Sequence, residues 1–418
     1  MKLRHPLAAS GAALCAAAAS LGAQAQNAPY YIGISQGFTH ESNVLHTERG
    51  AVSDTLSVTS LLAGVDQRIG RQRVFGNLNY SINRFQESDR LNNNSYGVLL
   101  GVDWETIERI SGTVSLRADQ ALSRYDYITV NNAAGVPQLV TDRNTARSLQ
   151  FSSITRIGVV TRLTAELGFN HQRIDHSSAL YDFRDYHHNA FSAGLRYQFS
   201  GSLNAGIAAR FTKGTYPHLR TNVPGVYASD DVDRRDIDLT ANWTPGGASA
   251  LYGRLSLSQT DHSLGGGNNF SGVTGALTWD WRPTGKLRFV STLSHDTGEE
   301  AGYLGGGGYD MALSNGRTTT AIGTQATYEL SSKVVIDGSA RLVHRSLSAD
   351  VAVPGGVNSL SGSDNFSRFS LGVRWSPTRV FTLGCSASLE SRTTGNRALS
   401  YPYDATSLGC YGQAMLRF

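Results

Sequence analysis

The chain has 418 residues, of which 40% are hydrophobic and 17% charged, and its formal net charge is +4. A charge this close to neutral argues against nucleic-acid binding, which usually accompanies a strong basic excess. The aromatic content of 9% argues against disorder. The mean hydropathy is −0.24, and after residue 25 no apolar run is long enough for a transmembrane helix.

The first residues have the layout of a secretory signal peptide. Lys2 and Arg4 form a basic region, residues 7–21 an apolar core, and Ala23-Gln24-Ala25 a cleavage site of the A-x-A type. The sequence therefore predicts a signal peptide at 1–25 and a mature domain at 26–418 that leaves the cytoplasm.

Apolar and polar residues alternate through the mature sequence in short segments that end in turns. In residues 203–211, for example, Ile207 and Phe211 share one face while Asn204 and Arg210 share the other. Residues 191–199, 237–243 and 369–375 repeat the pattern. A period of two with one apolar face indicates a β-strand that is half buried.

The expected turns alternate between short and long. Short turns fall near 70–71, 107–109, 160–161, 201, 245–247, 283–285, 331–332 and 377–378; longer polar stretches fall near 40–53, 87–95, 126–145, 176–186, 216–231, 262–269, 297–316, 347–364 and 393–404. This alternation is typical of outer-membrane barrels. We predict an all-β, antiparallel, up-and-down transmembrane barrel of eighteen strands, with sixteen as the alternative. The first strand starts near Tyr30, so no plug domain is expected, and loops 126–145, 297–316 and 347–364 are the candidates for a constriction.

Two features at strand ends support this prediction. All five tryptophans lie within a few residues of a short turn, as expected for a periplasmic aromatic girdle: Trp104, Trp243, Trp279, Trp281 and Trp375. The last strand alternates from 407 onward and ends on Phe418, which resembles the signal read by the barrel-assembly machinery.

Strand parity assigns two sets of charged side chains to the lumen. The arginines are Arg117, Arg196, Arg210, Arg254, Arg341 and Arg374, and the acids are Asp103, Asp119, Glu166, Asp236, Asp238 and Asp337. One interpretation is that opposite charges simply pair across strands in a wet interior. The other is a mixed-charge pore that admits large hydrated solutes, with arginine suited to planar hydrogen bonding.

Two cysteines remain after cleavage, Cys385 and Cys410, and the expected register of the last hairpin places them close to opposite one another. Export from the cytoplasm permits oxidation, so we predict a cross-strand disulfide. The alternative is two small lipid-facing residues.

The remaining groups of residues predict no metal, phosphate or catalytic site. The histidines near the outer loops, such as His176 and His187, lack firm ligand spacing, so no metal is expected. The glycine runs at 265–267 and 305–308 lack the Lys-Ser/Thr of a phosphate loop. We expect no cofactor and no enzymatic activity.

The N-terminal part carries a family resemblance. The segments are Tyr30–Gln36, Glu41-Ser-Asn-Val44, Asp54-Thr-Leu, 64–73, Asn92, Trp104 and 108–112. Over roughly residues 29–125 they resemble the EpsL-type barrel porins, outer-membrane proteins encoded in exopolysaccharide biosynthesis operons. Glu41 stands where this family is expected to have Asp.

The resemblance implies a location in the outer membrane of a Gram-negative bacterium and a role in exporting an exopolysaccharide through a passive wet pore. The implied partners are the exported polysaccharide, a periplasmic polysaccharide-export protein, an inner-membrane synthesis complex and the outer-membrane lipid. The alternatives are a general or sugar-specific diffusion porin for uptake and a structural or adhesive barrel.

Overall fold

The computed structural model describes residues 28–107, 109–123, 129–131, 137–139, 143–158, 161–220, 227–263, 269–297, 316–353, 356–397 and 399–418. The predicted signal peptide at 1–25 lies outside these residues, as do parts of the loops predicted at 126–145 and 297–316.

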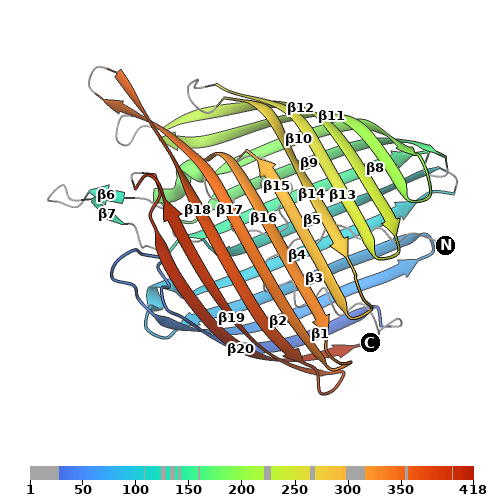
Figure 1. Cartoon of the computed structure of the whole chain (residues 1–418), viewed down its shortest axis with the longest axis horizontal. Helices are drawn as coiled ribbons and strands as arrows, with labels where there is room; N and C mark the ends of the chain where they lie inside the picture. The colour runs from blue at the N-terminus through green and yellow to red at the C-terminus, as the bar shows by residue number, and fades with distance from the viewer. Residues whose placement is uncertain are drawn as a thin grey trace.

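Eighteen antiparallel strands form one sheet that closes into a barrel (Figure 1). Consecutive barrel strands pair with one another, and closure comes from pairing of the first strand, β1 (Tyr30–Glu41), with the last, β20 (Tyr403–Arg417). The others are β2 (Asp54–Ile69), β3 (Gln72–Phe85), β4 (Asn93–Glu105), β5 (Ile110–Leu122), β8 (Thr145–Ile157), β9 (Leu163–His176), β10 (Tyr186–Gln198), β11 (Leu203–Arg220), β12 (Tyr227–Gly246), β13 (Ser249–His262), β14 (Phe270–Trp281), β15 (Leu287–Asp296), β16 (Gly316–Glu329), β17 (Val334–Val353), β18 (Gly356–Trp375) and β19 (Phe381–Thr394). The predicted all-β, eighteen-stranded barrel is confirmed.

The two ends of the barrel differ in their connections. At the end that carries both termini, the strands are joined by turns of two to five residues (Figure 1). The longer connections lie at the other end, together with a ribbon of β6 (Thr129–Asn131) and β7 (Pro137–Leu139) and two short 3-10 helices, η1 (Asp89–Leu91) and η2 (Ala179–Arg184). In single-chain barrels short turns face the periplasm, which makes the other end extracellular.

Two of the predicted long loops are largely strand. The prediction placed loops at 216–231 and 347–364, but β11 runs to Arg220 and β12 starts at Tyr227, while β17 and β18 continue their pairing up to Val353 and Gly356. Polar side chains suggested loops there. Backbone pairing needs no apolar face where a hairpin stands in water, so the β17–β18 ladder extends past the neighbouring strands (Figure 1).

Within the described part of the chain, the barrel has no continuous apolar core. Buried apolar side chains among the described residues form small clusters, of which the two largest are Val44, Leu45, Phe85 and Leu91, and Val343, Phe366, Tyr401, Tyr403 and Ala405. None of the described helices is long and apolar enough to cross a membrane. The apolar residues that a soluble domain would bury are instead exposed on the outside of the barrel.

Candidate functional site: the inner face of the barrel

Large apolar side chains cover the outer face. On β11 and β12, Ile207 (53% exposed), Phe211 (58%) and Leu239 (48%) point outward and alternate with buried Arg210 and Asp238. The same alternation recurs on the other barrel strands. A closed sheet leaves no unpaired backbone edge, so an exterior of this kind is suited to lipid. The protein is an outer-membrane β-barrel.

The densest part of the inner face is a charge network on β11 to β15, which we call the wall network. Arg210 bonds Asp238 (Nε to Oδ2, 3.0 Å) and lies 3.3 Å from Asp236, which also pairs with Arg234 at 2.9 Å. Arg254 lies 3.4 Å from both Asp238 and Asp296. Three arginines thus meet three aspartates, and their charges balance.

Hydroxyl groups complete the hydrogen bonding of the wall network. Ser256 and Ser258 each donate to one of the aspartates, and Thr297 accepts from Arg234 Nη1 at 2.6 Å. The side chains of Arg234 and Asp236 are 2% and 0% exposed. Buried charges are tolerable only when they are paired and hydrogen bonded in this way.

Smaller ion pairs cover the rest of the inner face. Each links neighbouring strands or positions on one strand: Arg73 with Asp66 and Asp103, Arg117 with Asp119, Arg156 and Arg196 with Glu166, Arg288 with Asp280, Arg374 with Asp337, Arg345 with Asp364, and Arg368 with Glu390. Most of the inner-face charge is therefore neutralised within the wall itself.

All twelve charged residues that the sequence assigned to the lumen lie at strand positions that alternate with outward side chains. The structure brings Arg210, Arg254, Asp236 and Asp238 together in the wall network, and it pairs Arg117 with Asp119, Arg196 with Glu166, and Arg374 with Asp337. Asp103 pairs with Arg73, which sequence reasoning missed.

Further participants were missed although the same parity would have found them: Asp66, Arg156, Arg234, Asp296, Arg345, Asp364, Arg368 and Glu390. Asp66, Arg156, Asp296 and Glu390 lie near strand ends, whereas Arg234, Arg345, Asp364 and Arg368 lie inside strands that extend into the predicted loops 216–231 and 347–364 or next to them. Arg341 is placed directly opposite Arg368 in the β17–β18 register, so two like charges face each other on the inner face.

The loop between β1 and β2, residues 42–53, folds over the inner face at the extracellular mouth. Val44 and Leu45 pack with Phe85 and Leu91 near β3. His46, with φ +50°, stacks on Tyr403 of β20 at 4.5 Å between ring centroids. This loop was not among the three candidates for a constriction. Its apolar anchors are only Val44 and Leu45, so its composition does not distinguish it from the other predicted loops.

Polar contacts fasten the same loop to the end of the barrel wall. His46 Nε2 lies 3.0 Å from Glu41 Oε1, and Asn43 Nδ2 donates to the carbonyl oxygen of Asp404 at 3.0 Å. Glu48 pairs with Arg397, in the connection between β19 and β20, at 2.7 Å. Two connections far apart in sequence therefore meet at the mouth.

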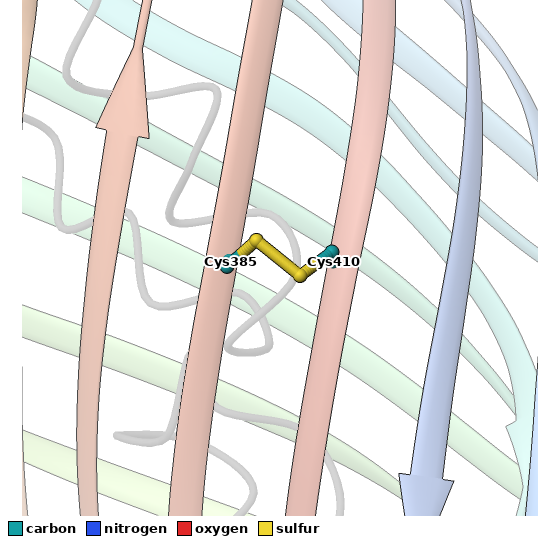
Figure 2. Close-up of a disulfide and its surroundings, with 2 residues drawn as sticks. All are labelled: Cys385 and Cys410. Carbon is teal, nitrogen blue, oxygen red and sulfur yellow. A yellow bond between two sulfur atoms is a disulfide. The ribbon is translucent and has the colours of Figure 1, made fainter.

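The predicted tryptophans and cysteines lie on the outer face. Trp243, Trp279, Trp281 and Trp375 are 36–48% exposed next to periplasmic turns, and Trp104 is half-buried on β4. Cys385 and Cys410 are register partners on β19 and β20 and form a disulfide with a Cα–Cα distance of 4.0 Å (Figure 2). Among the described residues no group of three or more His, Cys, Asp or Glu side chains could hold a metal ion.

No protein-family model matches the chain, and no curated protein matches it. Solved structures that resemble it include the FrpB iron transporter of Neisseria meningitidis (9% identity, 94% of this chain and 82% of that chain covered, TM-score 0.43) and Pseudomonas aeruginosa OccK3 (10%, 94% and 96%, 0.44). Another is OccK2 of P. aeruginosa in complex with glucuronate (13%, 94% and 99%, 0.45). At such identities and TM-scores nothing about substrate is transferred to the present chain.

Proposed function

We propose that the protein is a diffusion porin that admits small hydrophilic solutes, sugars among them, into the periplasm without an energy source. The observation that carries this proposal is the self-neutralised inner face. Barrels of sixteen to eighteen strands enclose an aqueous channel, and paired charges at its wall keep that channel wet without giving it a strong preference for either sign of ion.

Hydroxyl groups favour sugars over highly charged solutes. Serine pairs join neighbouring strands on the inner face at three places, each with an Oγ–Oγ distance of 2.7 Å: Ser60 with Ser81, Ser339 with Ser370, and Ser388 with Ser407. Such serine pairs can exchange hydrogen bonds with sugar hydroxyls. Hydrogen bonds between neutral groups are weak enough to release the solute. The twelve charged residues assigned to the lumen are proposed to line this path.

The test is reconstitution of the full chain into liposomes and planar bilayers. We expect swelling in isotonic solutions of neutral mono- and disaccharides, and single-channel conductance with a reversal potential near zero in a KCl gradient. Liposomes that admit no sugar and bilayers without conductance would sink the proposal. A deletion strain should also grow more slowly on limiting sugar.

A second candidate is export of an exopolysaccharide, and the resemblance over residues 29–125 is the observation that favours it. Several of the residues behind the resemblance hold the extracellular connections in place. Asp54 accepts the backbone N–H groups of residues 86–88, Asn92 Oδ1 accepts that of Phe85, and Asn43 ties loop 42–53 to β20. In this candidate a periplasmic polysaccharide-export protein and an inner-membrane synthesis complex supply the drive.

The same deletion strain separates the two candidates. Loss of polysaccharide outside the cell, with accumulation in the periplasm, would favour export. Normal secretion together with reduced sugar uptake would favour the diffusion porin. Glycosyltransferase genes next to the coding gene would also favour export.

A further inference from the structure

The outer face ends differently at its two rims. At the periplasmic rim the outward positions are mainly aromatic or aliphatic, as at Tyr30, Trp243 and Phe381. At the extracellular rim, eight strands carry a basic side chain or a histidine at the first outward position beyond the exposed apolar belt: His40, Arg84, Arg147, His171, Lys213, Arg235, His295 and His344. We call these eight residues the extracellular collar.

The register identifies the collar positions. Towards the extracellular end of its strand, each collar residue is the next outward position after an apolar side chain, two residues away. His40 comes after Phe38 (57% exposed), Lys213 after Phe211 (58%) and His295 after Leu293 (48%). On the other ten strands the residue at the same position, the first outward one beyond the apolar belt, is uncharged: Thr59, Asn94, Gln120, Asn189, Gln259, Ser271, Thr320, Ser367, Ser391 and Thr406. No carboxylate occupies the position on any of the eighteen strands, all of which are described there.

The four collar histidines are all held in the same way. Each uses Nδ1 to bond a side-chain oxygen of its direct register partner: His40 with Thr55 (3.1 Å), His171 with Asn189 (2.9 Å), His295 with Thr320 (2.7 Å) and His344 with Asn365 (2.8 Å). These bonds fix the rings and leave Nε2 as the atom that can meet a ligand outside the barrel.

The best-defined part of the collar is a row across β15 to β18. Thr320 is the register partner of both His295 and His344, so the two histidines lie two strand spacings apart, about 10 Å. Asn365 continues the row on β18. Among the described residues, the outward side chains next to this row are uncharged. Two imidazole rings in one row suit a ligand with separated anionic groups.

Carboxylates face two of the collar residues from neighbouring strands: Asp233 is the register partner of Lys213, and Asp175 is that of Arg147. Asp233 lies two positions beyond Arg235 on β12 and pairs with Lys213 at 3.4 Å, while Asp175 lies beyond His171 on β9 and pairs with Arg173 at 2.8 Å. At the collar positions themselves, where the apolar belt stops, the charged side chains are all basic. In a membrane this is the level of the lipid headgroups.

We propose that the extracellular collar binds the phosphate groups of the outer-leaflet glycolipid, lipopolysaccharide. Anionic groups at a membrane surface attract basic side chains at that depth, and a protonated histidine adds an N–H donor for a phosphate oxygen. Histidine is the side chain that most commonly changes its protonation between pH 5 and 8, so lipid binding is expected to strengthen as pH falls. This binding is independent of what passes through the lumen.

The test titrates the full chain in detergent with phosphorylated lipid A and counts bound lipid by native mass spectrometry. We compare wild type with a triple variant (Arg84→Gln, Lys213→Gln and Arg235→Gln) and with a histidine variant (His295→Gln and His344→Gln). The matched control is Lys286→Gln with Lys333→Gln, which removes two exposed cations from the periplasmic turns. Heat-modifiable migration in gels verifies that each variant is folded.

The triple variant should bind lipid A more weakly by about fivefold for each removed cation, and the periplasmic control should bind like wild type. Wild type should bind more tightly at pH 5.5 than at pH 8, and the histidine variant, which keeps His40 and His171, should show a smaller difference.

Three results would overturn the proposal: equal affinity for dephosphorylated lipid A, an equal loss in the periplasmic control, or displacement of the lipid by inorganic phosphate at the same concentration, which would indicate a site for a soluble anion. The dephosphorylated-lipid and pH comparisons use wild type alone, so they remain decisive if a variant does not fold.

Discussion

Removal of one carboxylate from the wall network should destabilise the barrel strongly. Asp236 has a fully buried side chain and is shared by Arg234 and Arg210 at 2.9 and 3.3 Å. Asp236→Ala leaves the Arg234 guanidinium, 2% exposed, without its carboxylate. Breaking a buried pair by removing one partner typically costs about 3–5 kcal/mol, and we expect a loss of that size in the free energy of unfolding.

The measurement is urea-induced unfolding in detergent micelles, followed by tryptophan fluorescence. The matched control is Asp119→Ala, because Arg117 and Asp119 form an inner-face pair at 2.6 Å in which both side chains are 31% exposed. Pairs that water reaches contribute about 0–1 kcal/mol. The double variant Arg234→Met with Asp236→Leu should recover much of the loss, since it leaves neither of those two charges buried. Equal stability of the Asp236→Ala and Asp119→Ala proteins would refute the reasoning.

Three further outcomes are expected. Replacing both Cys385 and Cys410 with Ser should lower the free energy of unfolding by about 3 kcal/mol, because the crosslink closes a loop of 25 residues; an unchanged urea midpoint, relative to the oxidised wild type, would contradict this. Leu45→Ala should loosen the β1–β2 loop at the mouth and raise single-channel conductance or its noise, whereas identical traces would show that the loop does not restrict the channel. Replacing Arg341 and Arg368 with Gln should shift the reversal potential in a KCl gradient towards cation preference, and a shift towards anions would contradict the inner-face assignment.

The strand pattern was readable because the barrel separates its two faces so completely. On strands such as β11, the apolar set Ile207 and Phe211 belongs to lipid and the polar residue Arg210 to the interior, so period-two alternation predicts both the strand and its orientation. The short turns were recognisable because they interrupt this alternation at regular intervals. Strand number follows from their count.

The partners of each inner charge were not predictable from the same pattern. Parity assigns Asp103 and Arg254 to the inner face, but it does not say that one pairs with Arg73 and the other with both Asp238 and Asp296. Those pairs depend on the stagger between neighbouring strands, and a shift of two residues preserves the face while changing every partner. The fold of the 42–53 loop depends on contacts with β20, which are more distant still in sequence.

The contacts across the β1–β20 seam have a consequence for assembly. Tyr30 and Phe418 stack at one rim, with ring centroids 5.9 Å apart, and at the other rim His46 stacks on Tyr403 while Glu48 pairs with Arg397. Each of these contacts joins the first hairpin of the barrel to the last. None of them can form before β20 has reached β1, so the mouth takes its final shape only in the step that completes the cylinder. A fluorescent or crosslinking probe at His46 would therefore report the moment of closure rather than the insertion of individual hairpins.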